Sequence, residues 1–347
     1  MPPFNLSDSA LNDRGVVPNR TLADFYLGAP LGSPNSTIGL GPEYTHMKMG
    51  QDQHWNFGIQ KQISRMMLVD LEYVGNKGTH LAGSDAFNIP EPGPGAIQAR
   101  RPYPRFANFS YFANDISSTY HALQGKFEKR LSGGVWFLTS YTFSKSLWSI
   151  STPAAGGRYR FEKGPSEFHV PHSFAGSFGY ELPFGRGKKL AGDVNRFANA
   201  VIGGWQMQGI FLFRSGVPFT VSLSRDVANT GVGGQRPNRL ARGSSDNPTL
   251  ERWFDPTAFV AASNFTYGNS GLRIISTDIL RTVDFSLFKQ FQINDHSKVQ
   301  FRVEAFNLPN TPSFGAPNAT LDTSTVGRIT GTATAPRQMQ VALKYTF

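Results

Sequence analysis

The last residues of the chain alternate between apolar and polar side chains. One face of this extended segment carries Met339, Val341, Leu343, Tyr345 and Phe347, and the other carries Gln338, Gln340, Ala342, Lys344 and Thr346. About ten residues with one apolar face, ending on aromatics, suit a tilted strand that crosses an outer membrane. A strand of a soluble sandwich can show the same alternation, so the rest of the chain has to distinguish the two.

The same alternation recurs upstream and predicts more strands. It is found at residues 55–63, 69–73, 123–131, 135–143, 174–182, 205–213, 283–291 and 299–305. Glycine and asparagine at residues 75–78 mark the expected end of the second strand, and a proline-rich loop is expected from there to about Ser118. Together with the closing segment, the pattern predicts about nine strands. Residues 197–202 are expected to form a short helix.

Residues 205–221 allow two interpretations. Apolar side chains at odd-numbered positions in residues 205–213 continue at Phe219 and Val221. This favours one long strand with a bulge. A tight hairpin at Ser215-Gly216 is the alternative. The bulged strand puts the connections at residues 64–65, 132–133, 183–202 and 294–296 at the end of the sheet that carries Phe347, and every very long loop at the opposite end. The hairpin breaks this separation for everything upstream.

Short turns at one end and long loops at the other are typical of outer-membrane barrels. The predicted fold is therefore all-β, a transmembrane antiparallel β-barrel, with residues 1–52 as a loop-rich N-terminal segment and residues 53–347 as the C-terminal part of the barrel. Nine strands is an odd number, and a barrel cannot leave an unpaired edge in lipid. We therefore expect these nine or ten strands to be part of a larger barrel.

Composition narrows the function. Aromatics make up 13% of the 347 residues, with 36 Gly and 23 Pro, which suits strands and loops. The net charge of +10 is spread along the chain and forms no basic stripe, so no nucleic-acid partner is expected. No apolar run is long enough for a transmembrane helix. The opening residues also show no signal peptide, so we expect the chain to lack an export signal of its own.

No residue pattern predicts catalysis. The chain has no cysteine, and its seven histidines show no metal-ligand spacing. The segment Gly185-Arg-Gly-Lys-Lys189 does not have the glycine spacing of a phosphate-binding loop. We therefore expect a protein that is not an enzyme, with no cofactor and no metal. Lys129 and Lys289 lie on apolar strand faces and are expected near a membrane interface, with their charged heads extending to water.

Ligand recognition, if present, is expected in the long outer loops, because loops on a rigid scaffold carry binding. The candidate residues there suit a polar or aromatic ligand and are Arg236, Arg239, Trp253, Phe254 and Tyr267. The alternative is that these side chains pack the loops on one another.

An ordered series of short motifs resembles one family. The motifs are Tyr73-Val-Gly-Asn-Lys-Gly-Thr79, Tyr120-His-Ala-Leu-Gln124, Tyr141-Thr-Phe-Ser-Lys-Ser146, Leu182-Pro-Phe-Gly-Arg-Gly187, Gly204-Trp205 with Ser215-Gly-Val-Pro-Phe219, Phe301-Arg-Val-Glu-Ala-Phe-Asn307 and the closing strand. From about residue 50 to the end, the chain resembles TonB-dependent outer-membrane receptors. Within them it is similar to the Oar-like group, which carries an N-terminal carboxypeptidase-regulatory-like domain.

The resemblance implies a 22-stranded barrel in the outer membrane of a Gram-negative-type bacterium, filled by a plug and coupled to the TonB complex. It also implies uptake of a ligand that the sequence does not identify. The closing strand, Met339 to Phe347, resembles the terminal strand that the barrel-assembly machinery reads. Expected partners are therefore outer-membrane lipid, that machinery and TonB, although no plug or TonB-contacting segment is recognisable here. The alternative is a secreted or surface all-β module without transport activity.

Overall fold

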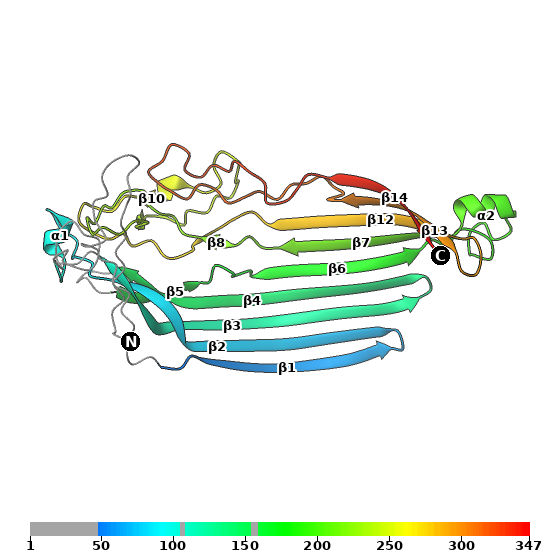
Figure 1. The fold of residues 1–347 in the computed structure, drawn as a ribbon, viewed down its shortest axis with the longest axis horizontal. Helices are drawn as coiled ribbons and strands as arrows, with labels where there is room; N and C mark the ends of the chain where they lie inside the picture. Colours follow the sequence, from blue (N-terminus) through cyan, green and yellow to red (C-terminus); the bar gives the residue numbers. More distant parts are fainter. Residues whose placement is uncertain (1–47, 105–107, 154–158) are drawn as a thin grey trace, which may run out of the picture.

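The computed structural model of the chain describes residues 48–104, 108–153 and 159–347. Most of the loop-rich segment predicted for residues 1–52 therefore lies outside the described residues. The described part is dominated by one antiparallel sheet of ten strands (Figure 1). These strands are β1 (Gln51–Ser64), β2 (Met67–Phe87), β3 (Phe109–Ser132), β4 (Val135–Pro153), β5 (Tyr159–Pro165), β6 (His172–Glu181), β7 (Trp205–Arg214), β12 (Leu280–Gln292), β13 (Lys298–Phe306) and β14 (Gln338–Thr346).

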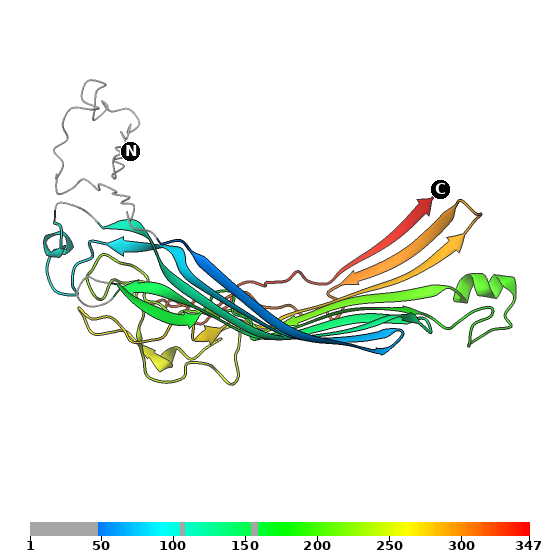
Figure 2. The same ribbon diagram turned by 90° about the horizontal axis from the view of Figure 1, so that it is seen from below.

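The sheet is an open, curved wall. Its order is β1-β2-β3-β4-β6-β7-β12-β13-β14, so each strand pairs with its sequence neighbour within the wall, and β5 pairs only with β4. Figure 2 shows the C-terminal strands curling away from the plane of the others. β1 and β14 form the two edges. The prediction of an all-β antiparallel sheet with about nine wall strands is confirmed.

The pairing register aligns the apolar positions of all wall strands on one face. One row crosses the sheet from β6 to β14 through Phe178, Gly209, Phe285, Ala305 and Met339. Because side chains alternate across a strand, this register gives a continuous apolar face and leaves the polar positions on the other. This arrangement agrees with the alternation seen in the sequence.

Glycines on the apolar face leave room for aromatic rings of the neighbouring strand. A Cβ atom placed on Gly176 would lie 2.3 Å from the ring of Phe211, and one on Gly209 would lie 2.4 Å from the ring of Phe178. Each ring therefore covers the backbone of the glycine that it pairs with in the register. Such cross-strand pairs are the local unit of sheet stabilisation.

Short and long connections separate as predicted (Figure 1). β1 and β2 are joined through Arg65 and Met66, and β3 and β4 through Gly133 and Gly134. These turns, the connection from β12 to β13, and the C-terminus share one end of the sheet. The long connections, among them residues 215–279 and 307–337, gather at the opposite end.

Three strands are longer than the sequence pattern indicated. β2 was expected to end at residues 75–78 but continues to Phe87, and the loop expected to reach Ser118 gives way to β3 at Phe109. β4 likewise runs on to Pro153 and pairs there with β5, which the pattern did not show. These extensions lack a continuous apolar face, so backbone pairing rather than side-chain alternation defines them.

The bulged strand expected beyond Arg214 is wrong, and so is the alternative hairpin. β7 ends at Arg214, and β8 (Pro218–Phe219) pairs separately with β11 (Ile275–Ser276). Arg214 pairs with Leu280 and Phe219 pairs with Ile275, so the register is the same on both sides of the gap and no residue is inserted. The chain therefore follows the path of one long strand, but its hydrogen-bond ladder is interrupted between Arg214 and Pro218 and contains no bulge.

Short elements complete the fold. The predicted helix at residues 197–202 is confirmed as α2. The short elements are α1 (Ile97–Arg100), α2 (Arg196–Ile202), β9 (Asn238–Arg239), the 3-10 helix η1 (Pro256–Ala258) and β10 (Phe259–Val260). β9 and β10 pair within the long connection between β7 and β12.

The two lysines on the apolar face lie close to the short-turn end, as expected, but their heads contact the protein. The Nζ of Lys129 donates to the carbonyls of Ser132, at 2.7 Å, and Val135, at 2.6 Å. Lys289 is only 4% exposed, and its Nζ donates to the carbonyl of Ala200 at 2.6 Å. The expected extension of these heads to water is therefore wrong for Lys289, because carbonyls at the end of α2 replace the water.

Candidate functional site in the long-loop cluster

The long connections fold into one cluster with its own apolar core. Phe254 is completely buried, and it packs edge-on against Phe219 and Phe259 with ring centroids 5.8 and 6.1 Å apart. Val221 and Ile275 complete this core. Buried aromatic contacts of this kind hold segments that are distant in sequence at fixed positions.

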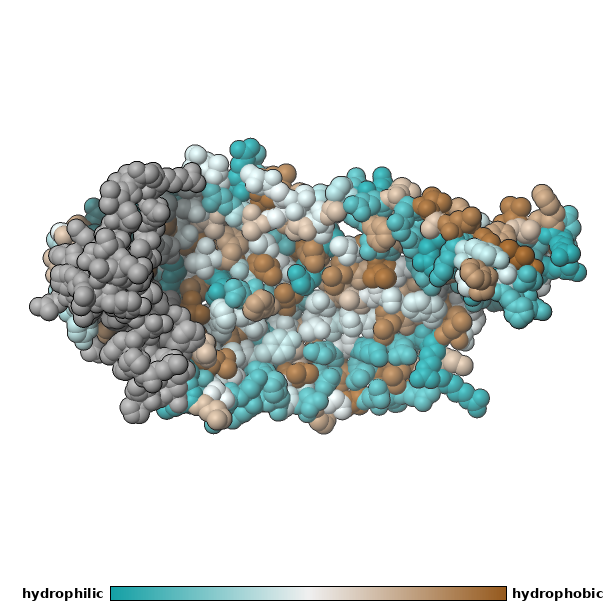
Figure 3. All heavy atoms as spheres, viewed as in Figure 1, coloured by the Kyte–Doolittle hydropathy of each residue, from teal (hydrophilic) through white to brown (hydrophobic). Residues whose placement is uncertain are grey.

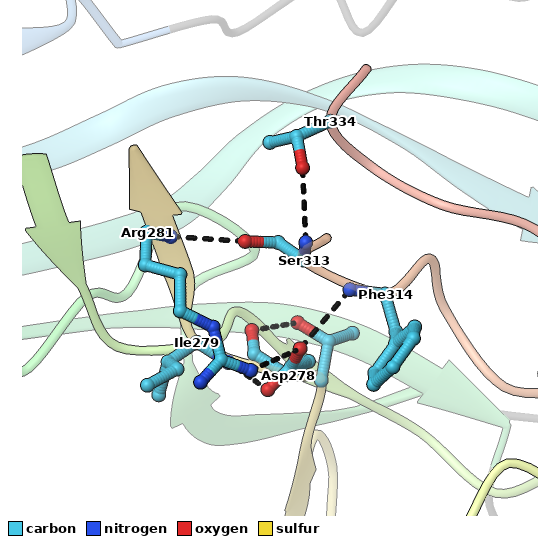
Figure 4. A network of polar contacts seen from close by, with 7 residues as sticks. Asp278, Ile279, Arg281, Ser313, Phe314 and Thr334 are labelled. Carbon is cyan, nitrogen blue, oxygen red and sulfur yellow. Dashed lines mark hydrogen bonds and ion pairs between the residues drawn. The ribbon is translucent and has the colours of Figure 1, made fainter. Parts of the chain in front are cut away.

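Polar contacts fasten this cluster to the start of β12 (Figure 4). The Asp278 carboxylate accepts from the backbone amide of Phe314 at 3.0 Å and from Arg281 at 3.4 Å. The Arg281 amide donates to the Ser313 hydroxyl, and the Ser313 amide donates to Thr334, both at 2.9 Å. The network joins the connection between β13 and β14 to the place where the β7–β12 ladder is interrupted.

A second carboxylate joins two long connections. Asp322 accepts from the amide and the hydroxyl of Ser224 at 2.7 and 2.8 Å. Burial raises the pKa of Asp322, but these hydrogen bonds outweigh it and leave the pKa below its ordinary value. The carboxylate therefore stays ionised and keeps residues 224 and 322 together.

The cluster forms a half-open cavity of about 770 Å³, within the usual size range of small-molecule sites. Its walls come from the connection between β2 and β3, from β4 and from residues 220–273. The lining residues are Glu91, Pro92, Ile150, Thr220, Val232, Gly233, Gly234, Gln235, Arg236, Phe265, Thr266, Tyr267, Gly268, Asn269, Leu272 and Arg273.

Arg236 is held in the cavity wall by an ion pair. Its guanidinium binds both carboxylate oxygens of Glu162 in β5, at 3.0 and 2.6 Å, and also donates to the carbonyl of Ser270 at 2.6 Å. Both charged side chains are largely buried, at 15% and 20% exposure. A planar two-point pair fixes orientation as well as distance, so this contact sets how the residue 236 segment lies against β5.

Tyr267 lies in the cavity wall with its hydroxyl buried. Its buried hydroxyl has no hydrogen-bond partner among the described residues within ordinary distance. Burial raises the pKa of Tyr267, the Thr230 hydroxyl lowers it, and the nearby carboxylates of Asp226 and Glu91 raise it further. The hydroxyl therefore remains protonated at neutral pH.

Arg273 supplies a second cation in the wall. Its guanidinium lies 5.1 Å from the ring centroid of Trp148 and donates to the carbonyl of Pro165 at 3.3 Å. Burial lowers the pKa of Arg273 but leaves it above any physiological pH. With Glu91 on another part of the wall, the cavity offers a carboxylate and a guanidinium to a ligand.

Only some of the five loop residues selected from the sequence lie in the cavity wall. Arg236 and Tyr267 line the cavity, whereas Arg239, Trp253 and Phe254 do not. Arg239 donates to the carbonyls of Ala241 and Arg242 in its own loop, and Trp253 donates to the carbonyl of Ser276. Trp253 and Phe254 pack the loop core, as the alternative interpretation of these side chains proposed.

Other lining residues were missed by sequence reasoning. Gly233 and Gly234 precede Gln235-Arg236, and this glycine pair next to a selected arginine was a visible signal. Arg273 in the wall, and Glu162 that pairs with the lining residue Arg236, had no such signal, because they meet Trp148 and Arg236 only after the loops have folded. The closing-strand residues Met339, Val341, Leu343, Tyr345 and Phe347 lie far from the cavity, exposed along the edge strand β14 and at its end.

Replacing Arg236 with Met is expected to loosen this wall. The variant loses a two-point ionic contact, and hydrogen bonds to charged groups contribute about 1.5–3 kcal/mol. Hydrogen exchange of the amides around residue 236 measures the change as a lower opening free energy. Arg225→Met is the control, because Arg225 meets Asp322 at 3.3 Å while 66% exposed, a contact worth about 0–1 kcal/mol. Equal effects of the two variants would contradict the structural role of Arg236.

Among the described residues, no cluster of three or more His, Asp or Glu side chains could hold a metal ion. No helix in the same part of the chain is long and apolar enough to cross a membrane.

Comparisons with known proteins assign the chain to a family. The model of the family described as "Outer membrane beta barrel domain" matches residues 1–340. Among solved structures, the chain is similar to the outer membrane transporter YddB from Escherichia coli, with 10% identity and a TM-score of 0.43. That match covers 88% of this chain and 34% of the transporter chain, so the chain spans about a third of its length. A comparison with curated proteins finds no match.

Proposed function

This chain belongs to the outer membrane beta barrel domain family, and we propose that it forms the C-terminal part of a TonB-dependent, Oar-like receptor. In this proposal it is not an enzyme and contributes to energy-coupled uptake of a ligand. Membership of the family places it in the outer membrane and favours a barrel over a secreted module. Its apolar face then contacts membrane lipid.

The ordered series of motifs carries the proposal, and the positions of the motifs support it. The residue 73–79, 120–124 and 141–146 motifs lie within β2, β3 and β4, and most of the residue 301–307 motif lies within β13. The residue 182–187 motif follows β6 at the short-turn end. The motifs therefore mark successive strands and turns of one wall, as expected for a barrel family.

The long-loop cavity is the proposed ligand-contacting part. It lies at the end that outer-membrane proteins turn to the exterior, because their long loops are extracellular. The charged side chains of Glu91 and Arg273 in its wall suit a small polar ligand. In the same proposal, the barrel-assembly machinery recognises β14, and the TonB complex acts through a plug.

Two matched cysteine variants test the orientation. The native chain has no cysteine, so Asp246→Cys in the long-loop cluster and Asp295→Cys in the turn between β12 and β13 each provide one thiol. Both positions are exposed. In intact cells, a maleimide that cannot cross membranes is expected to label residue 246 but to label residue 295 only after the outer membrane is opened. The reverse pattern would reject the proposed orientation.

The coding sequence upstream of residue 1 tests the receptor assignment separately. An open frame that continues into further alternating strands, a plug and a TonB-contacting segment is expected. If it is present, deleting the TonB-contacting segment should abolish uptake while leaving the barrel in the outer membrane. A stop codon directly upstream would contradict the receptor assignment and leave the barrel fold unaffected.

A further inference from the structure

The connection between β6 and β7 projects beyond the short-turn end of the sheet and carries α2 (Figure 2). The N-terminus of α2 is capped, because the Asn195 side chain accepts from the Ala198 amide at 2.8 Å. The Asn199 side chain accepts from the Arg186 amide at 2.7 Å, which holds the preceding basic segment against the helix. The connection is therefore an ordered element despite its exposed position.

Two side chains fix α2 to the apolar side of the sheet. Lys289 shares the apolar face of β12 with Leu287 and Phe291, and its Nζ donates to the carbonyl of Ala200 at 2.6 Å. Trp205, on the same face, donates from its ring nitrogen to the carbonyl of Val201 at 2.9 Å. A cation at the C-terminus of a helix is favourable, because the last carbonyls carry partial negative charge. The last turn of α2 therefore lies at the rim of the lipid-facing side.

The free side of α2 exposes large apolar side chains. Phe197 is 82% exposed and Val201 is 58% exposed, and their four-residue spacing puts them on the same side of the helix. Phe184 and Leu190, in the preceding segment, are also exposed. Figure 3 shows hydrophobic and hydrophilic residues side by side at this end of the molecule.

Basic residues flank this apolar side. Arg186, Lys188, Lys189 and Arg196 are exposed within one connection, which contains a single acidic residue, Asp193. Lys188 lies 3.5 Å from Glu181, with both side chains about half exposed. The element combines apolar side chains at the edge of the lipid-facing surface with a surplus of positive charge.

We propose that residues 183–204 form an interfacial anchor that binds anionic phospholipid headgroups at the rim of the barrel. Phe197 and Val201 enter the boundary between headgroups and acyl chains, and the four basic side chains pair with lipid phosphates. The lipid-facing band of the strands continues directly into this surface through Lys289 and Trp205, so the same bilayer covers both. The inference uses the family assignment and does not depend on ligand uptake.

Single spin labels test the depth of the anchor. Phe197→Cys and Asp193→Cys are labelled in the full chain, folded into bicelles of phosphatidylcholine with phosphatidylglycerol. The label at residue 197 is expected about 5–10 Å inside the headgroup boundary, accessible to oxygen and shielded from a water-soluble nickel complex. The label at residue 193 is expected to remain open to the complex. Equal access at both positions would overturn the proposal, including the case in which this surface serves a soluble partner.

A charge variant tests the lipid class. Lys188→Gln, Lys189→Gln and Arg196→Gln together should raise the phosphatidylglycerol content needed to immerse the residue 197 label. Each basic residue at an anionic surface contributes about fivefold to partitioning, so a loss on the order of 100-fold is expected. The control removes three exposed charges at the opposite end, with Lys163→Gln, Arg225→Gln and Arg242→Gln. An unchanged lipid response in the first variant, or the same loss in the control, would overturn the role of the anionic headgroups.

Discussion

In the barrel that contains this wall, Phe285→Arg is expected to prevent stable insertion into lipid vesicles. Phe285 lies in the middle of the apolar row and pairs with Gly209 on one side and Ala305 on the other. A guanidinium near the bilayer midplane costs about 2–4 kcal/mol. Losing the phenyl group, which is partly buried, adds up to about 1.5–3 kcal/mol. The sum is comparable with the whole net stability of a typical domain, about 5–15 kcal/mol.

The matched control is Gln208→Arg. Gln208 is adjacent to Gly209 in β7, but its side chain points to the polar face, where it pairs with Ser286 and Gly179. We expect this variant to insert with a stability change within about 1 kcal/mol, because the new charge stays on the side away from lipid. Urea unfolding in phosphatidylcholine vesicles measures both variants. Equal losses would mean that the face we assign to lipid is assigned wrongly.

Gly216→Val is expected to open the long-loop cluster while leaving the wall strands folded. A Cβ atom at residue 216 would lie 1.9 Å from the carbonyl oxygen of Thr277 and 2.7 Å from that of Asp278. Both are backbone atoms, so no side chain can move aside, and the cost is about 3 kcal/mol or more. The clash lies in the gap between the β7–β12 and β8–β11 pairings. It therefore breaks the hydrogen bonds between Val217 and Thr277 and disturbs the hydrogen-bond network of Asp278.

Hydrogen exchange resolves where the damage occurs. Amides around residues 217 and 277 should lose protection in Gly216→Val, while amides in the middle of β12 keep theirs. Gly125→Val is the control, because no atom lies within 4 Å of a Cβ placed there and the strand favours a β-branched residue. Uniform loss of protection in Gly216→Val, or matching behaviour of the control, would contradict a local clash.

The sequence predicts the wall best where a strand has lipid on one side. In that zone every second residue has to be apolar, so segments such as residues 135–143 stand out. Beyond it, no lipid contacts the strand, so no alternation is required. The outer parts of β2 and β4, and all of β5, therefore carried no readable pattern, although their backbones pair as regularly as the rest.

The candidate site was harder to predict for a related reason. Arg236 and Tyr267 could be selected because arginine and tyrosine often bind ligands, but the same reasoning selected Phe254, which is completely buried. Side-chain type alone does not tell a lining residue from a packing residue. That difference depends on which distant segment covers each side chain, as β5 covers Arg236 through Glu162.

The glycine and aromatic pairs on the apolar face have a consequence for assembly errors. β6 presents Gly176 and Phe178, and β7 presents Phe211 and Gly209 opposite them. A slip of two residues, the smallest that keeps each face intact, would set Phe178 against Phe211 in one direction and Gly176 against Gly209 in the other. Either slip breaks both native pairs, in which a ring covers the backbone of the glycine opposite it. The fit between each glycine and the ring opposite it therefore favours the native alignment of these strands as the barrel wall forms.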